Sequence, residues 1–309
     1  MDNKKFADEH RIFEFLSGSH AYGTQRPGSD KDYRGVFITP FEKSLSSNAP
    51  EQLDSFDGED RVMYSLKKFF KLATTNNPNI IEFFFIPSDS IIYSSHLWDR
   101  IRNKRDIFVS QKCVHTFMGY GFEQLKRIER HRGYLLDPPD HKPTREEYDL
   151  PEQTVIPGDQ LSALLSIKDE FLSTEYKTIA RREKAYDQAK RKWDSYKNWE
   201  KNRNADRKKL EAVAGYDTKH AMHLIRLMLM ANELVSTGKC NVRRPDADYL
   251  LDIRKGKYDY ETISALAKSL EEKCLKVKET SVLPYSPNHK AIEELQLEIL
   301  KECYDVSIR

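Results

Sequence analysis

The stretch that decides the fold lies near the N-terminus, where residues 17–24 read SGSHAYGT and residues 27–38 read PGSDKDYRGVFI. The run FEFL (residues 13–16) comes directly before it, and the stretch itself ends in VFI. Aromatic and β-branched runs of this kind are typical of strands. The stretch therefore predicts a strand, a small-residue turn, and an acidic pair that enters a second strand. Because Asp30 and Asp32 are two residues apart, a strand would point both carboxylates to one side, roughly 6 to 7 Å apart.

The turn and the acidic pair have the residue types of a site for a triphosphate and divalent cations. At Gly18 and Ser19, a tight turn would let backbone N–H groups and a hydroxyl approach phosphates, and a Cβ at the glycine would collide with them. Mg²⁺ prefers oxygen ligands, and two carboxylates at this spacing suit shared metal ions. The structural alternative is a turn whose Ser and Asp residues only cap the backbone.

The periodicity of the chain changes near residue 110. Before it, runs at residues 62–64 and 80–86 predict further strands, and LKKFFKLATT (residues 66–75) predicts a helix that ends at Asn77-Pro78. After it, the periodicity is helical at residues 117–131, 159–172, 219–235, 260–277 and 291–304. The sequence predicts a catalytic domain over residues 1–110 and an α-helical domain over residues 111–309.

Composition limits the class of protein. The 51 Lys and Arg nearly balance the 49 Asp and Glu, so a nucleic-acid footprint would have to be local. Four cysteines lie far apart without zinc-ligand spacing and are expected to be free thiols, namely Cys113, Cys240, Cys274 and Cys303. The charged N-terminus and the lack of a long apolar stretch predict a cytoplasmic protein without a membrane span.

A local basic block occupies residues 177–209, with thirteen Lys or Arg against five Asp or Glu. Four aromatic residues are interleaved with the cations, namely Tyr186, Trp193, Tyr196 and Trp199. Their spacing fits a helix packed onto its neighbours through the rings. The cations could at the same time face a nucleic-acid backbone, so the two interpretations are compatible.

The Gly-Ser pair, ten intervening residues and Asp-x-Asp resemble the signature of the DNA polymerase beta-type nucleotidyltransferase superfamily. The longer string GSHAYGT…SDKDYRGVFI is similar to a narrower group, the RNA repair pathway DNA polymerase beta family, and residues 64–87 and 215–263 resemble further regions of that group. The basic block has no counterpart in this resemblance. The resemblance implies an α+β fold, in which a polymerase beta-like domain with a small mixed sheet is followed by an α-helical domain.

The resemblance also implies roles for the residues of the motif. Gly18 and Ser19 would hold the triphosphate, while Asp30 and Asp32 would ligate two Mg²⁺ or Mn²⁺ ions. Arg34, which follows the acidic pair, would either contact phosphate or neutralise the carboxylates.

A third carboxylate normally completes a site of this kind. The family tends to have an acidic residue before the helix at 66–75, which favours Asp60 over Glu59 and Glu82. Asp60 would bind the catalytic metal and help to deprotonate the acceptor hydroxyl. Glu82 would then have a supporting or structural role.

The segment KHAMHLIR (residues 219–226) predicts a second set of site residues. Helical spacing places Lys219, His223 and Arg226 on roughly one face. Lys219 and Arg226 would reach the triphosphate across a cleft and balance charge as pyrophosphate leaves. The alternative for the two histidines, His220 and His223, is that they are ordinary interior residues of the helix.

The function predicted is transfer of a nucleoside monophosphate from a nucleoside triphosphate to an acceptor hydroxyl, with an RNA end, tRNA-like or nicked, as the preferred acceptor. One alternative is transfer to a protein or a small molecule, as in toxin-type or antibiotic-modifying relatives of the superfamily. Another is a binding module that keeps the fold without the chemistry, against which the intact Gly18, Ser19, Asp30 and Asp32 argue.

Overall fold

The computed structural model describes residues 3–54, 58–168 and 171–307, and they form two compact units. Unit 1 comprises Met1–Ile128 together with Thr218–Arg309, and unit 2 comprises Glu129–Asp217. The division by packing thus falls at other positions than the domain boundary near residue 110, which stays a prediction.

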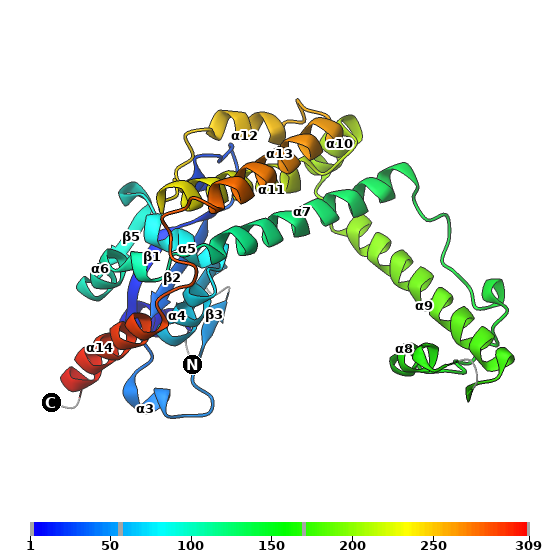
Figure 1. The fold of residues 1–309 in the computed structure, drawn as a ribbon, viewed down its shortest axis with the longest axis horizontal. Coiled ribbons are helices and arrows are strands. Elements are labelled where there is room, and N and C mark those ends of the chain that lie inside the picture. The colour runs from blue at the N-terminus through cyan, green and yellow to red at the C-terminus, as the bar shows by residue number, and fades with distance from the viewer. Residues whose placement is uncertain (1–2, 55–57, 169–170, 308–309) are drawn as a thin grey trace. The chain divides into compact units, whose positions relative to one another are not determined.

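A five-stranded mixed sheet lies at the centre of unit 1 (Figure 1). The strand order is β3-β4-β2-β1-β5, in which β2 and β4 are parallel and the other neighbours are antiparallel. The strands are β1 (Arg11–Leu16), β2 (Asp32–Phe37), β3 (Gln52–Asp54), β4 (Asp60–Ser65) and β5 (Ile91–Ser94). The small mixed sheet predicted for the N-terminal region is therefore confirmed.

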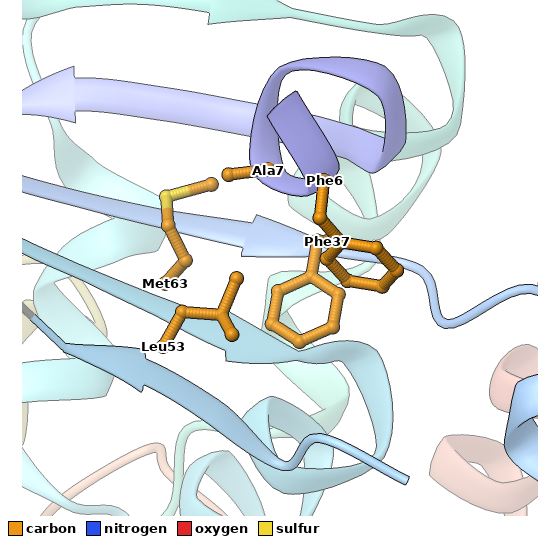
Figure 2. Close-up of a cluster of buried hydrophobic side chains, with 5 residues drawn as sticks. All are labelled: Phe6, Ala7, Phe37, Leu53 and Met63. Carbon is orange, nitrogen blue, oxygen red and sulfur yellow. The ribbon is translucent and has the colours of Figure 1, made fainter. Parts of the chain in front are cut away.

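Helix α1 (Asn3–His10) covers one face of this sheet. Figure 2 shows the contact, in which two α1 side chains meet three side chains from β2, β3 and β4. All five are buried, namely Phe6, Ala7, Phe37, Leu53 and Met63. Because side chains alternate along a strand, the neighbours of Phe37 and Met63 in β2 and β4 point to the opposite face.

An aromatic core covers that opposite face. It is formed with α4 (Leu66–Thr74), α5 (Pro78–Ile81), the 3₁₀ helix η1 (Glu82–Phe85) and α6 (His96–Asn103). The Phe13 ring stacks on Trp98 at 4.1 Å between centroids, and the Phe83 ring meets Phe15 edge-on at 4.7 Å. Buried aromatic rings contribute a large apolar area, so these contacts stabilise the packing of the helices against the sheet.

The strand predicted at residues 80–86 is wrong, because this segment forms α5 and η1 instead. The Asn77 side chain caps α5 by accepting a hydrogen bond from the Asn79 amide, and Pro78 takes the first helical position. An apolar run that is buried on all sides lacks the alternation that separates a strand from a buried helix. The helix predicted at residues 66–75 is confirmed as α4.

The rest of unit 1 is mostly helical, as predicted. Short helices connect the N-terminal elements, namely α2 (Gly18–Tyr22), α3 (Phe41–Ser44), η2 (Ser88–Ser90) and η3 (Arg105–Ile107). The long helix α7 (Lys112–Leu136) begins in unit 1, and four helices follow unit 2, namely α11 (Thr218–Thr237), α12 (Ala247–Arg254), α13 (Tyr260–Lys278) and α14 (His289–Ser307). Helix α11 packs on α12 and α13, while α14 packs on α4. Across the described residues, no helix combines the length and the apolar character that a membrane span requires.

Unit 2 contains the end of α7 with η4 (Glu146–Tyr148), α8 (Gly158–Ser166), α9 (Thr174–Lys201) and α10 (Ala205–Ala214). Helix α8 confirms the start of the helix predicted at residues 159–172 but ends at Ser166, and residues 169–170 lie outside the described residues. A small core of Ile156, Leu161 and Ala180 joins α8 to α9. Unit 2 therefore has an apolar core of its own.

Candidate active site

Strand β1 ends, and strands β2 and β4 begin, at the same end of the sheet. Asp32 and Asp60 are the first residues of two parallel neighbours, and they are direct register partners. Their side chains therefore lie side by side on the face opposite α1. The Ser17 amide donates a hydrogen bond to the Asp32 carbonyl (2.7 Å), which ties the end of β1 to the same point.

The Asp60 and Asp30 carboxylates lie close enough to Asp32 to affect its pKa. Burial raises the pKa of Asp32, and the negative charges of Asp60 and Asp30 raise this pKa further, while the Arg34 guanidinium opposes them. Asp30 precedes the strand, which begins at Asp32, so the two carboxylates of the Asp-x-Asp pair do not both come from β2. The site predicted from the pair is formed by the end of a loop and the start of a strand.

Gly18 packs directly against Asp32. Its φ is +62°, in the left-handed region, and a Cβ built on it would lie 2.2 Å from Asp32 Oδ2. No side chain fits in that space unless the carboxylate moves. The prediction gave a collision with phosphates as the reason for this glycine, whereas the protein itself shows a collision with Asp32.

Asp60 and Glu59 have different partners in the structure, and only Asp60 lies beside Asp32. Arg34 Nη1 lies 3.2 Å from Asp60 Oδ1, on the face that carries Asp32. Glu59 instead accepts a hydrogen bond from Arg61 Nη2 (2.9 Å), and Arg61 Nη1 pairs with Glu14 (3.0 Å) on the face covered by α1. Asp60 is therefore the carboxylate next to Asp32, and Arg34 pairs with it.

Glu82 lies in a buried cluster with Tyr22 and Arg226. The Tyr22 hydroxyl donates a hydrogen bond to Glu82 Oε2 (2.7 Å), and Arg226 Nη1 lies 3.8 Å from the same oxygen. The Arg226 guanidinium also lies 3.8 Å from the centre of the Tyr22 ring. Burial raises the pKa of Glu82, and Arg226 and the Tyr22 hydrogen bond oppose that rise. Since Tyr22 ends α2, this cluster supports the short helix that starts at Gly18.

The predicted cations of α11 lie at different depths. Lys219 is exposed in the first turn, whereas Arg226 is buried two turns further on. Burial lowers the pKa of His223 well below its usual range, and Arg226 and Lys219 lower it further. The three side chains are therefore neighbours on one face of the helix, as the spacing indicated.

Two arginines that the motif reasoning did not single out hold α2 in place. Arg243 Nη1 donates to the His20 carbonyl (3.1 Å), and the Arg244 amide donates to the Tyr22 carbonyl (3.0 Å). They lie in the segment RRPDAD (residues 243–248), where adjacent arginines and acidic residues are the only signal that the sequence offers.

The donor set fits divalent cations. Asp32 feels the like charges of Asp60 and Asp30, and a cation bound beside it would relieve that repulsion. Asp30 and Asp60 are exposed, so their oxygens are accessible to a ligand.

Two comparisons with known proteins found matches to this chain. A family model described as the RNA repair pathway DNA polymerase beta family matches residues 4–135, and this is a polymerase beta-like nucleotidyltransferase family. The chain is also similar to a protein of Enterobacteria phage T4, the "Uncharacterized 38.9 kDa protein in nrdC-mobD intergenic region". The identity is 24% over 281 residues, which cover 80% of this chain and 83% of the phage protein. No solved structure matches the chain. Over residues 4–135, which carry the Gly-Ser turn and all three aspartates, the match confirms the RNA repair pathway DNA polymerase beta family as the family predicted from the sequence.

Proposed function

We propose that this protein transfers a nucleoside monophosphate from a nucleoside triphosphate to a terminal hydroxyl of RNA and releases pyrophosphate. The observation that carries the proposal is the pairing of Asp32 with Asp60 on adjacent parallel strands, with Gly18 packed on the Asp32 carboxylate. In the reaction, the bond between the α-phosphorus and the pyrophosphate oxygen breaks, and a bond from the acceptor oxygen to that phosphorus forms.

The three aspartates have separate proposed roles in this reaction. Asp30, Asp32 and Asp60 would hold two Mg²⁺ or Mn²⁺ ions, which activate the acceptor hydroxyl and stabilise the leaving pyrophosphate when bound. Asp60 is exposed and can also accept the proton of the acceptor hydroxyl.

The cradle for the triphosphate is proposed to be α2. Gly18 and Ser19 begin this helix, and Gly18 leaves the space that keeps Asp32 in position. Arg226 is buried and lies against Tyr22 at the C-terminal end of α2. Its positive charge would therefore stabilise the triphosphate from the buried side of this helix. Lys219, exposed on the same face of α11, is proposed to neutralise phosphate charge from the solvent side.

RNA is the proposed acceptor because the family belongs to an RNA repair pathway and because the chain carries a local basic block. The test is incubation of the purified protein with each α-labelled nucleoside triphosphate, Mg²⁺ or Mn²⁺, and either total RNA or a protein extract. We expect the label in RNA, and we expect the Asp30→Ala, Asp32→Ala double variant to lose it. Label found only in protein would contradict the RNA proposal and favour protein nucleotidylation.

The role of Asp60 has a matched control in its neighbour. We expect Asp60→Asn to lower the transfer rate by about 100-fold or more, because it removes both a metal ligand and a proton acceptor. We expect Glu59→Gln to retain a rate close to that of the unmodified protein, because Glu59 pairs with Arg61. Equal losses of transfer rate in the two variants would contradict the assignment of Asp60 as the third carboxylate.

A further inference from the structure

A groove in unit 2 lies between the C-terminal end of α7 and the C-terminal half of α9. Its volume is about 440 Å³. Helix α7 contributes Arg130, Gly133 and Tyr134, Asp137 follows the end of this helix, and α9 contributes Arg191, Lys192 and Ser195. No residue of the proposed active site lines it.

The groove is positively charged. Arg130 and Lys192 are exposed, and neither makes an ion pair or hydrogen bond within the described part of the chain. Arg191 pairs with Asp187 at 2.7 Å, and Asp137 is the one carboxylate among the lining residues. The lining therefore presents more positive than negative charge to a ligand.

The charge continues along α9 beyond the groove. Arg181, Lys184 and Lys192 are all exposed, and spacings of three and eight residues, close to one and two helical turns, place them on the same stripe of the helix as the groove. From residue 181 to residue 192 the helix rises about 17 Å. A row of cations of this length suits a ligand with repeated negative charges better than a single phosphate group.

The aromatic rings of the basic block are used for packing. Tyr134 of α7 contacts Tyr196 and Trp199 of α9, with ring centroids 5.4 and 5.3 Å apart. Arg203 lies over the Trp199 ring at 4.1 Å. These rings are half-buried or buried, so the groove offers cations rather than free rings, which favours recognition of a backbone over stacking on bases.

Gly133 leaves the floor of the groove open. It lies inside α7, where glycine costs about 1 kcal/mol relative to alanine. A Cβ at Gly133 would meet nothing within 4 Å, and its φ is outside the left-handed region. Neither packing within the protein nor backbone conformation requires a glycine here, whereas a ligand in the groove would gain the space.

We propose that this groove, together with the cationic stripe of α9, binds the sugar-phosphate backbone of the RNA acceptor without regard to base sequence. The identity of this RNA as the acceptor rests on the proposed function, but binding itself does not. Holding the acceptor on the chain would raise its effective concentration for transfer.

The test is fluorescence anisotropy of a labelled RNA hairpin with the full-length protein at several KCl concentrations. We expect Gly133→Glu, and separately the Arg130→Glu, Lys192→Glu double variant, to raise the Kd roughly tenfold or more for each phosphate that the protein no longer binds. The slope of log Kd against log salt should fall by about 0.7 to 0.9 for each such phosphate. A control should bind as the unmodified protein does, namely Lys290→Glu, which reverses an exposed charge in unit 1.

The outcomes separate RNA binding in the groove from the proposed function. Unchanged Kd and salt slope in both groove variants, with thermal unfolding like that of the unmodified protein, would overturn the groove proposal, even if RNA is labelled in the transfer assay. Loss of binding in the groove variants would support it, even if no RNA is labelled, because anisotropy requires no catalysis. Competition by polyglutamate as strong as that by unlabelled RNA would also overturn it, since the surface would then recognise acidic protein.

Discussion

Gly18 links the backbone to the chemistry of the carboxylate cluster. Its left-handed φ turns the chain out of β1, and the absence of a side chain lets the Asp32 carboxylate lie against its α carbon. Asp32 is thereby held beside Asp60, whose position is set by the register of β2 and β4. The spacing of the carboxylates therefore depends on a residue that has no functional group of its own.

Gly28 provides a control for this role of Gly18. It also has a left-handed φ, of +77°, but a Cβ there would meet nothing within 4 Å. An alanine in either position should cost about 1 to 2 kcal/mol of stability, because both backbones are left-handed. We expect only Gly18→Ala to lower transfer as well, by about 100-fold, since only that variant displaces Asp32.

The measurement combines thermal unfolding with the transfer assay for both variants. Equal losses of transfer in Gly18→Ala and Gly28→Ala would show that backbone strain alone explains the requirement for glycine.

At the scale of elements, the loop between α11 and α12 fixes α2 through two adjacent arginines that differ in depth. The Arg244 side chain is 1% exposed and bonds to both Glu233 (2.9 Å) and Asp246 (2.8 Å). The Arg243 side chain is 41% exposed and pairs with Asp89 at 3.0 Å.

The difference in depth predicts a difference in stability. Arg244→Ala should lower the free energy of unfolding by about 3 to 5 kcal/mol, because two carboxylates lose a buried partner. Arg243→Ala should cost about 1 kcal/mol or less, as for an exposed ion pair. Urea unfolding of the two variants checks this, and a loss in Arg243→Ala as large as that in Arg244→Ala would contradict it.

Helix α11 has a pH dependence that follows from His223. Its pKa in the folded protein is lowered well below the ordinary value of 6.5 by burial, Arg226 and Lys219, with smaller contributions from His220 and Arg254. Below pH 6.5 the unfolded chain therefore binds a proton that the folded protein does not. Stability is fully present above this pH and falls as the pH drops towards the folded pKa.

The expected slope is at most about 1.4 kcal/mol per pH unit. Urea unfolding on both sides of pH 6.5 should show this loss for the unmodified protein and a flatter profile for His223→Gln. Identical profiles for the two proteins would mean that His223 does not titrate as its surroundings indicate.

At the scale of the whole molecule, unit 1 is assembled from two ends of the chain. Helix α14 packs on α4 and contains the buried residues Ile292, Leu295 and Ile299, and its Tyr304 hydroxyl donates to the Thr39 carbonyl (3.1 Å). The last helix of the chain is thus part of the unit that carries the carboxylates. Unit 2 has a core of its own, so we expect the two units to respond separately to core substitutions.

Two core variants test this expectation. Ile299→Ala should destabilise unit 1 by about 2 to 5 kcal/mol, and Leu161→Ala should destabilise unit 2 by a similar amount. Calorimetry of the two variants should show different transitions shifted, with loss of triphosphate binding following the transition of unit 1. A single transition shifted equally by both variants would show that the units unfold together.

Local patterns in the chain were sufficient to predict much of the fold and to propose part of the candidate site. The strands around the motif, helix α4 and the helices after residue 110 follow from side-chain periodicity, and the family and Asp30, Asp32 and Gly18 follow from one short motif. The prediction failed at residues 80–86, because a wholly buried apolar run has no alternation to distinguish strand from helix. It also did not single out Arg243 and Arg244, whose partners lie far away in sequence.

The sequence by itself determined the chemistry available, because the carboxylates, the glycine turn and the basic block are local properties of the chain. Only the tertiary structure decided which of these groups meet. Asp60 became the neighbour of Asp32 through the register of two parallel strands, while Glu59 was taken by Arg61 on the other face of the sheet. The physical reason is that register and packing depend on contacts between residues distant in sequence, which no local pattern specifies.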